Sequence, residues 1–258
     1  MTADAFTLAR RLRAGETVYS AWCALASPIV VESIVREGFS AAVLDAQHGL
    51  WDTAAIVAAI GAVHAAGATP ALRIPLNDFA LVSRALDFGA EAIIAPMINT
   101  ATDARAFAAV AKYPPLGERS WGPTRAMTLQ GKSVASDYLR EANQGTLTCA
   151  MIETPTALAN VNEIATTPGI DALFIGPYDL STSLSAGKAQ DIMAPEVERA
   201  IDVIGEAAVK AGKIPGIYCR DASRALAMAK RGFRYITVGS DLGFLREGTA
   251  AQLKALKQ

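Results

Sequence analysis

The stretch TLTCAMIETPTALANVNEIATTPGIDALFI, residues 146–175, contains one complete strand–helix–strand unit. Its two ends, Thr146–Ile152 and Asp171–Ile175, are short apolar runs with the length and composition of buried strands. Pro155 is suited to the first position of a helix, and Gly169 is suited to its end. Apolar residues recur at helical spacing between them, namely Leu158, Val161 and Ile164. This order predicts two parallel strands joined by a crossover helix.

Six further apolar runs of the same kind extend the pattern along the chain. They are Val18–Leu25, Ala41–Leu44, Thr69–Ile74, Glu91–Pro96, Ile214–Tyr218 and Tyr235–Val238. The segments between them carry helix-start residues such as Asp52, Pro195, Asp221 and Asp241. Eight alternations without a linker predict an α/β fold, a (β/α)8 TIM barrel forming a single domain over residues 1–258. An open doubly wound sheet is the alternative, although no Gly-x-Gly-x-x-Gly motif follows the first run.

Composition and charge argue against several classes of protein. The 258 residues are 52% hydrophobic and 19% charged, which suits one well-packed α/β body. The net charge of -1 argues against a nucleic-acid partner, and no apolar run is long enough to span a membrane. Residues 1–16 lack the apolar region of a signal peptide, and the three isolated cysteines suit a reducing compartment. We therefore expect a cytoplasmic protein with no membrane partner.

Polar residues occur where the second and third predicted strands end. In barrel enzymes the loops that follow the strands converge on one face and carry the active site. His48 follows the second strand and is either a solvated loop residue or a catalytic group, with Asp45 as its nearest candidate partner. Arg73 follows an apolar run, so it must either pair with a carboxylate or face a ligand.

Two carboxylates, Glu153 and Asp179, follow the fifth and sixth predicted strands. If these side chains lie close together they repel, so a cation or a shared proton is expected between them. Oxygen ligands on rigid strand ends suit Mg²⁺ or Mn²⁺. Helix capping, pairing with arginine and a two-carboxylate glycosidase pair are the alternatives.

One connection, Tyr113–Gln144 between the fourth and fifth strands, is irregular. It carries PPLGERSWGPTRAM and then a short helical pattern. A connection of this length inside a compact domain is more often functional than idle, so we expect this one to have a role in function.

Six motifs together resemble the class II, metal-dependent pyruvate aldolases of the HpcH/HpaI family. They are LDAQHGLWD (44–52), LRIPLND (72–78), LDFGAEAIIAPM (86–97), GERSWGPTRA (117–126), MIETP (151–155) and FIGPYDLS (174–181). The resemblance runs along essentially the whole chain, in the family's order and at its spacings. It implies a barrel that cleaves or forms 4-hydroxy-2-oxo acids, giving pyruvate or hydroxypyruvate and an aldehyde.

The resemblance also implies roles for individual residues. Glu153 and Asp179 would ligate one divalent cation (Mg²⁺, Mn²⁺ or Co²⁺), with no organic cofactor. His48 would be the general base, and Asp87 would raise its basicity. Arg73 would stabilise the enolate.

Further residues are implied to contact the substrate. The backbone amides of Tyr178 and Asp179 would hold the carboxylate of the 2-oxo acid. Met151 stands where family members typically carry a glutamine that touches substrate, and Gln47 stands where relatives often carry glutamate. Both departures bear on substrate choice more than on the core chemistry.

Other activities and the assembly stay open. The same polar set could serve a metal-dependent carbon–carbon lyase acting on an acyl-CoA ester, an oxaloacetate decarboxylase, or a non-catalytic barrel that binds 2-oxo acids. A Schiff-base aldolase is disfavoured, because it needs a lysine inside the barrel and the lysines fall in predicted helices, loops or the tail. The resemblance implies a homohexamer, a trimer of dimers, in which the C-terminal helix (residues 241–258) is exchanged between subunits.

Overall fold

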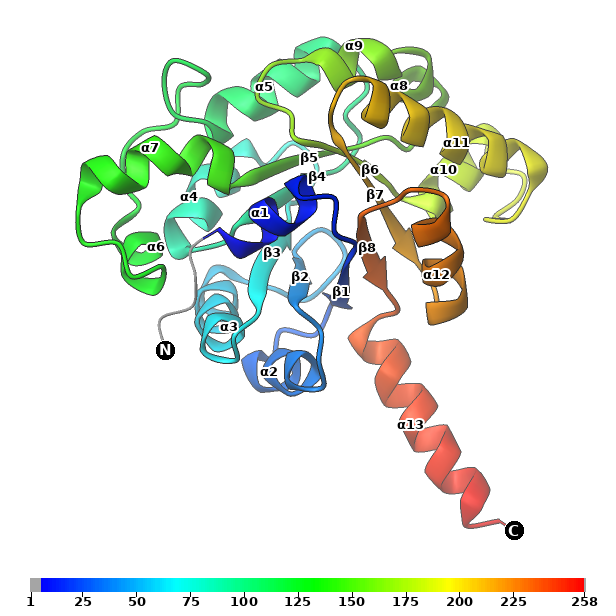
Figure 1. The fold of residues 1–258 in the computed structure, drawn as a ribbon. Coiled ribbons are helices and arrows are strands. Elements are labelled where there is room, and N and C mark those ends of the chain that lie inside the picture. The colour runs from blue at the N-terminus through cyan, green and yellow to red at the C-terminus, as the bar shows by residue number, and fades with distance from the viewer. Residues whose placement is uncertain (1–5, 258) are drawn as a thin grey trace.

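The computed structural model describes residues 6–257, and at its centre is a closed sheet of eight parallel strands (Figure 1). The strands are β1 (Val18–Cys23), β2 (Ala41–Asp45), β3 (Thr69–Arg73), β4 (Ala92–Ala95), β5 (Leu147–Met151), β6 (Ala172–Ile175), β7 (Ile214–Cys219) and β8 (Tyr235–Val238). Each strand pairs with the next along the chain, and β8 pairs with β1. The predicted (β/α)8 barrel is confirmed, and the open sheet is wrong, because a closed barrel has no edge strand.

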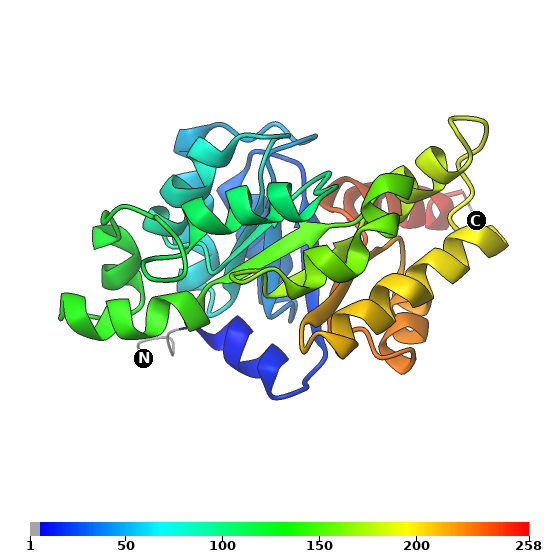
Figure 2. The same cartoon turned by 90° about the horizontal axis from the view of Figure 1, so that it is seen from above.

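Most of the helices surround the strands on the outside of the barrel (Figure 2). They are α1 (Thr7–Arg13), α2 (Pro28–Arg36), α3 (Thr53–Ala65), α4 (Phe79–Phe88), α5 (Ala101–Ala111), α6 (Thr124–Leu129), α7 (Ala135–Gly145), α8 (Pro155–Ala159), α9 (Val161–Thr166), α10 (Pro177–Leu184), α11 (Pro195–Lys210), α12 (Ala222–Lys230) and α13 (Asp241–Ala255). None of the helices within residues 6–257 combines the length and apolarity needed to cross a membrane. Residues 1–5 of the N-terminal stretch and residue 258 of the predicted exchanged helix lie outside the described residues.

Two of the predicted helix starts, Asp52 and Asp221, are confirmed by their capping contacts. The Asp52 and Asp221 carboxylates accept hydrogen bonds from the first turns of α3 and α12, at 2.7 and 2.9 Å. Asp241 is not the cap of α13, because Ser240 takes that position. The Asp241 carboxylate is buried and accepts instead from the backbone N–H of Leu25, 2.8 Å away in the loop after β1.

Two apolar layers hold the barrel together. The outer layer packs the strands against the helices, and the inner layer fills the barrel from Leu8 and Leu12 of α1 to Trp22 and Met151. The three cysteines are buried and free, as their isolation in the sequence predicts. The inner layer ends just below the C-terminal ends of the strands. It therefore forms the floor of any cavity at that face of the barrel.

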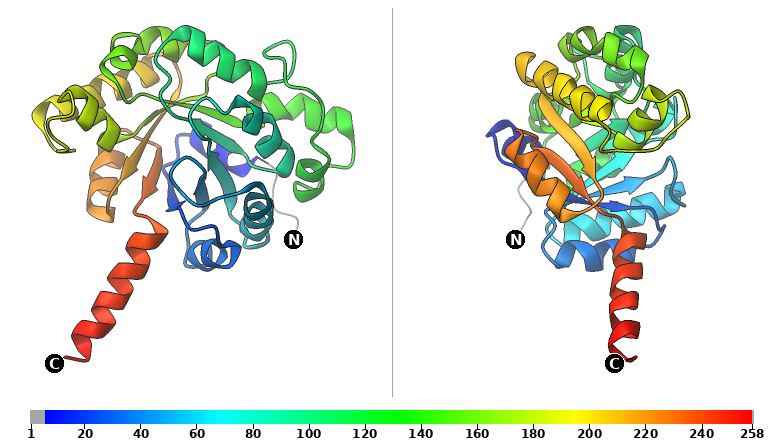
Figure 3. Two further views of the ribbon diagram at one scale, coloured as in Figure 1. Left: turned by 180° about the vertical axis from the view of Figure 1, so that it is seen from behind. Right: turned by 90° about the vertical axis from the view of Figure 1, so that its right-hand side faces the viewer.

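Helix α13 differs from the other long helices, because it projects away from the barrel (Figures 1 and 3). Asp241 in its first turn is its one buried residue among those described. Its leucines are exposed to solvent, namely Leu242, Leu245 and Leu253, together with Leu256 just beyond its end. A helix of this length gains most of its stability from packing, so this exposed apolar face lacks the contact that would stabilise it.

Candidate active site

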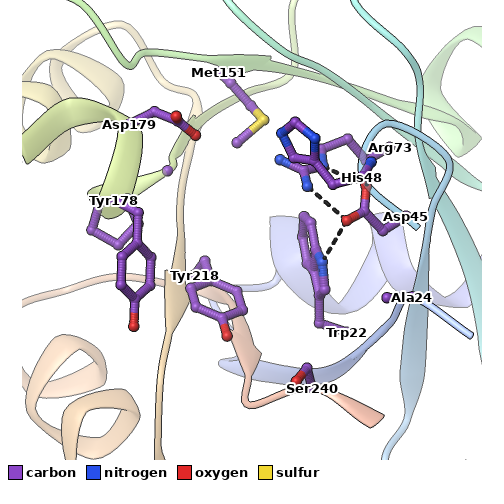
Figure 4. Close-up of a pocket in the computed structure, with 12 residues that line it drawn as sticks. Trp22, Ala24, Asp45, His48, Arg73, Met151, Tyr178, Asp179, Tyr218 and Ser240 are labelled. Atoms are coloured by element: carbon purple, nitrogen blue, oxygen red, sulfur yellow. Dashed lines mark hydrogen bonds and ion pairs between the residues drawn. The ribbon is translucent and has the colours of Figure 1, made fainter. Parts of the chain in front are cut away.

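A cavity of about 300 Å³ opens at the C-terminal ends of the strands (Figure 4). Residues that follow or end β1, β2, β3, β5, β6, β7 and β8 line it. Six residues singled out in the sequence are among them, namely Asp45, His48, Arg73, Met151, Tyr178 and Asp179. The strand-end argument therefore predicted the location of the cavity, since parallel strands bring their carboxyl ends to one face.

Arg73 and Asp45 form a buried ion pair in the wall of this cavity. They stand opposite each other in the register of β3 and β2, and Arg73 Nε and Nη2 donate to the two Asp45 oxygens at 2.8 and 2.7 Å. The guanidinium also lies over the Trp22 ring, 4.7 Å from its centroid, and Trp22 Nε1 donates to Asp45 Oδ2. Arg73 thus meets both expectations at once, because it pairs with a carboxylate and faces the cavity.

The same pairing controls the charge of Asp45. Burial alone would raise the pKa of the Asp45 carboxyl, but the hydrogen bond and positive charge of Arg73 outweigh burial and lower this pKa. Asp45 therefore stays ionised and keeps Arg73 in one orientation. A two-pronged arginine–carboxylate pair is among the most rigid polar contacts available to a protein.

His48 lies in the turn that follows β2, and its ring faces the cavity (Figure 4). Asp45 Oδ1 accepts hydrogen bonds from the backbone N–H groups of Gln47 and His48, at 3.1 and 3.3 Å. The contact between Asp45 and His48 is thus to the backbone, and Asp45 positions the turn that carries the imidazole. The hypothesis that Asp45 is the ring's partner has no such hydrogen bond to support it among the described residues.

Glu153 follows β5 and is 1% exposed, so it is buried beside Gly176 and is not among the residues that line the cavity. Its Oε2 atom accepts from the backbone N–H of Met97 at 3.1 Å, whereas its buried Oε1 atom has no hydrogen-bond partner within residues 6–257. Burial and the negative charge of Asp179 raise the pKa of the Glu153 carboxyl to about 7. The structure therefore brings these two carboxylates together in a site that disfavours the ionised pair unless a positive charge compensates it.

A divalent cation fits this arrangement. The unpartnered Glu153 oxygen and the Asp179 carboxylate are hard oxygen donors, and Mg²⁺ commonly binds through one or two carboxylates while water and substrate fill its other positions. In the described part of the chain no cluster of three or more acidic, histidine or cysteine side chains could supply a fuller protein ligand set. Gly176 leaves the space beside Glu153 open, because a side chain there would overlap Glu153 Oε1.

Helix α10 points its N-terminus into the same cavity. No side chain caps this helix, and Gly176, Pro177, Tyr178 and Asp179 of its first turn line the cavity. The backbone N–H groups of a first helical turn have no partner inside the helix, and with the helix dipole they favour a bound anion. The backbone amides of Tyr178 and Asp179 are therefore available to a carboxylate.

The structure places Asp87 away from this cavity. Asp87 lies near the end of α4, where its carboxylate accepts from Arg119 Nη2 at 2.6 Å. Arg119 belongs to the irregular connection, its side chain is fully buried, and it lies over the Tyr113 ring. Within one chain this connection fixes Asp87, but Asp87 does not line the cavity that holds His48.

Two aromatic residues of the site were missed in the sequence, namely Trp22 and Tyr218. Tyr218 ends its predicted strand, so the strand-end argument would have found it if it had been applied to uncharged side chains, whereas Trp22 lies inside the predicted strand Val18–Leu25. Aromatic residues at the end of an apolar run are ordinarily assigned to the core, and Trp22 does stack on Phe174 in the barrel interior.

The closed barrel with carboxylates, an arginine and a histidine at its strand ends is typical of (β/α)8-barrel enzymes. The sequence model of the HpcH/HpaI aldolase/citrate lyase family matches residues 19–247, and the chain belongs to this family. It is 37% identical over 231 residues to a hydroxypyruvate/pyruvate aldolase of Rhizorhabdus wittichii, covering 90% of each chain. It is 33% identical to a 5-keto-4-deoxy-D-glucarate aldolase of Klebsiella pneumoniae, covering 96% of this chain and 95% of that one.

A solved structure agrees with these sequence relatives. The crystal structure of an HpcH/HpaI aldolase/citrate lyase family protein from Burkholderia cenocepacia superposes with a TM-score of 0.88 at 32% identity, covering 98% of this chain and 99% of that one. The family resemblance carried by the six sequence motifs is thereby confirmed.

Proposed function

We propose that this protein is a divalent-metal-dependent aldolase, which reversibly cleaves 4-hydroxy-2-oxo acids into pyruvate or hydroxypyruvate and an aldehyde. Membership of the family and the aldolase names of the relatives support the reaction class. The observation that carries the metal requirement is the buried, unpartnered Oε1 atom of Glu153, next to Asp179. Mg²⁺, Mn²⁺ and Co²⁺ are the candidate cations.

Glu153 and Asp179 would hold the cation, which when bound supplies a Lewis acid for the oxygens of the 2-oxo acid. The amides of Tyr178 and Asp179 bind the carboxylate of that acid and so orient it in the cavity. Met151, buried beside this position, offers a thioether where an amide would offer hydrogen bonds. Met151 therefore offers the 2-oxo acid an apolar contact in this cavity.

Arg73 supplies fixed positive charge toward the carbonyl oxygen, where negative charge develops as the enolate forms. Its contacts to Asp45 and Trp22 hold it in place before the reaction, so little reorganisation is needed. In cleavage, His48 accepts the proton of the 4-hydroxyl, the C3–C4 bond breaks to release the aldehyde, and its electron pair forms the enolate, which takes up a proton at C3 to give the free 2-oxo acid. In synthesis, His48 returns that proton to the new alkoxide, a task that suits imidazole.

The proposed role of Asp87 depends on assembly of the protein into an oligomer. Raising the basicity of His48 would need a neighbouring subunit to bring Asp87 to the cavity, because Asp87 of the same chain pairs with Arg119 and lies outside it. We therefore link the role of Asp87 to the proposed hexamer.

The cavity disfavours an acyl-CoA ester as the substrate. Coenzyme A carries several phosphates, which proteins bind with basic side chains. Arg73 is the one arginine or lysine among the described residues that line the cavity, and it is already paired with Asp45. Decarboxylation of oxaloacetate passes through the same enolate, so we expect it as a side reaction of the same site.

The proposal is tested by following pyruvate in D₂O by NMR, with Mg²⁺, Mn²⁺ or Co²⁺ and with or without acetaldehyde. We expect the methyl protons of pyruvate to exchange for deuterium without acetaldehyde, and 4-hydroxy-2-oxopentanoate to accumulate when it is added. Neither exchange nor product with any of the three cations would refute the proposed function.

A further inference from the structure

The cavity has two chemically different sides (Figure 4). In this view Asp179, His48 and Arg73 lie along the upper side, which the proposed chemistry uses. The aromatic rings of Tyr178, Tyr218 and Trp22 lie below them, and Trp22 also contacts Arg73 and Asp45. A 2-oxo acid held at the charged side would leave the aromatic side free for the second substrate.

The aromatic side is a preformed surface. The rings of Trp22 and Tyr218 meet edge to face with centroids 5.5 Å apart, and Tyr178 lies 6.1 Å from Tyr218. Trp22 is 7% exposed and stacks on Phe174 of the barrel interior. Since these rings support one another and rest on the core, they present an apolar surface without rearrangement.

Charge at this cavity selects against an acidic aldehyde. Arg73 is paired with Asp45 and its charge serves the 2-oxo acid in the proposed chemistry, and no other lysine or arginine within residues 6–257 lines the cavity. The aldehyde's own carboxylate would lose hydration here without gaining a counter-charge, which is strongly unfavourable.

We infer that the aldehyde partner is uncharged and apolar, an aromatic or branched aliphatic aldehyde that sits against Trp22, Tyr178 and Tyr218. This inference rests on the proposed aldolase function and names the acceptor class of that reaction. In synthesis, C3 of the oxo acid loses a proton and bonds to the aldehyde carbon, whose oxygen takes up a proton. The product is a 4-aryl- or 4-alkyl-4-hydroxy-2-oxo acid, and no other co-reactant is needed.

The test compares kcat/KM for benzaldehyde and for succinic semialdehyde, with pyruvate as donor and Mn²⁺ present. We expect benzaldehyde to be preferred by tenfold or more, and any smaller ratio overturns the inference. Deuterium exchange into pyruvate without an aldehyde is measured in parallel. Exchange together with the wrong acceptor preference refutes the inference alone, whereas absence of exchange and of condensation with either aldehyde refutes the proposed function.

A matched pair of variants tests whether the aromatic side of the cavity causes the preference for benzaldehyde. Tyr218→Leu removes a ring from the aromatic side, whereas Tyr19→Leu makes the same change at a half-buried tyrosine that does not line the cavity. Loss of an aromatic contact is expected to lower the benzaldehyde-to-semialdehyde ratio about three- to tenfold in Tyr218→Leu. An unchanged ratio in Tyr218→Leu, or an equal fall in Tyr19→Leu, contradicts the assignment of the aromatic side to the aldehyde.

Discussion

At the scale of the residue, Arg73 shows how one side chain can be both structural and reactive. Its side chain is 8% exposed, and that of its partner Asp45 is 4% exposed, so both charges are largely removed from water. Such a pair is tolerated when its geometry is good and its remaining polar atoms find partners. Trp22 supports both members, through ring contact with the guanidinium and its N–H bond to the carboxylate. The resulting charge is fixed toward the substrate.

We predict that Arg73→Lys lowers kcat for aldol cleavage about 100- to 1000-fold, because an ammonium group cannot make the two-pronged contact that aims the charge. The lysine keeps a positive charge beside Asp45, so the protein should still fold, and its affinity for Mn²⁺ should change little. Arg84→Lys on the exposed side of α4 is the matched control. Steady-state kinetics and calorimetric Mn²⁺ titration measure the two effects, and near-wild-type turnover in Arg73→Lys contradicts the enolate role.

The charged residues of the site could be predicted from the sequence. His48, Arg73 and Asp179 are ionisable groups directly after apolar runs, so burial arguments single them out. Trp22 and Tyr218 carry no such mark, since an aromatic residue ending a strand is equally suited to the core. The Arg73–Asp45 contact depends on strand register, which side-chain chemistry alone does not fix.

At the scale of the element, the turn from β6 into α10 does the most for the site. Gly176 lets the chain pass directly beside Glu153. Pro177 is suited to the first position of the helix, because it lacks the N–H group that would have no partner there. The exposed amides of Tyr178 and Asp179 and the Asp179 carboxylate then occupy the same turn. One short turn thus supplies both an anion-binding end and a metal ligand.

We predict that Gly176→Ala weakens Mn²⁺ affinity at least tenfold, because the added methyl group would overlap Glu153 Oε1 and displace it. Gly248→Ala is the matched control, since a methyl group at that helical position meets no atom within 4 Å. Both variants are compared by calorimetric Mn²⁺ titration and thermal unfolding. Equal Mn²⁺ affinity in Gly176→Ala and wild type would show that Glu153 is not a ligand.

Elements were predicted well because their signals are local. Strand β8 matches its predicted bounds, and β3 and β6 differ from theirs by one residue at one end. Capping was less certain, as Asp241 illustrates, because a carboxylate at a helix start can be drawn to a backbone group far along the chain. The environment of Asp87 was likewise hidden, since Arg119 lies 32 residues away in an irregular connection.

At the scale of the whole molecule, α13 is the feature that a single chain does not explain. The barrel closes without it, and it projects with an exposed row of leucines (Figure 3). An exposed apolar face of this kind marks a contact with another surface. We propose that it packs on a second copy of the chain, as the exchanged helix of a hexamer.

We predict that wild-type protein has the mass of a hexamer in light scattering after gel filtration, and that Leu253→Glu with Leu256→Glu reduces this mass. Charges placed on the helix face lose hydration when the face is buried, which disfavours assembly. The matched control, Val203→Glu with Val209→Glu, alters two exposed apolar residues of α11. A monomeric wild type, or equal masses for both double variants and wild type, contradicts the exchange of α13.

The most direct measurement is the rate of 4-hydroxy-2-oxopentanoate cleavage before EDTA treatment, after it, and after Mg²⁺, Mn²⁺ or Co²⁺ is restored. Glu153→Gln and Glu91→Gln serve as matched variants, because burial raises the pKa of both carboxyls to about 7 and Glu91 lies at the opposite end of the barrel. We predict that EDTA abolishes cleavage, that a divalent cation restores it to wild type and Glu91→Gln, and that Glu153→Gln stays inactive. Full cleavage by metal-free protein, or by Glu153→Gln, would contradict a metal-dependent aldolase.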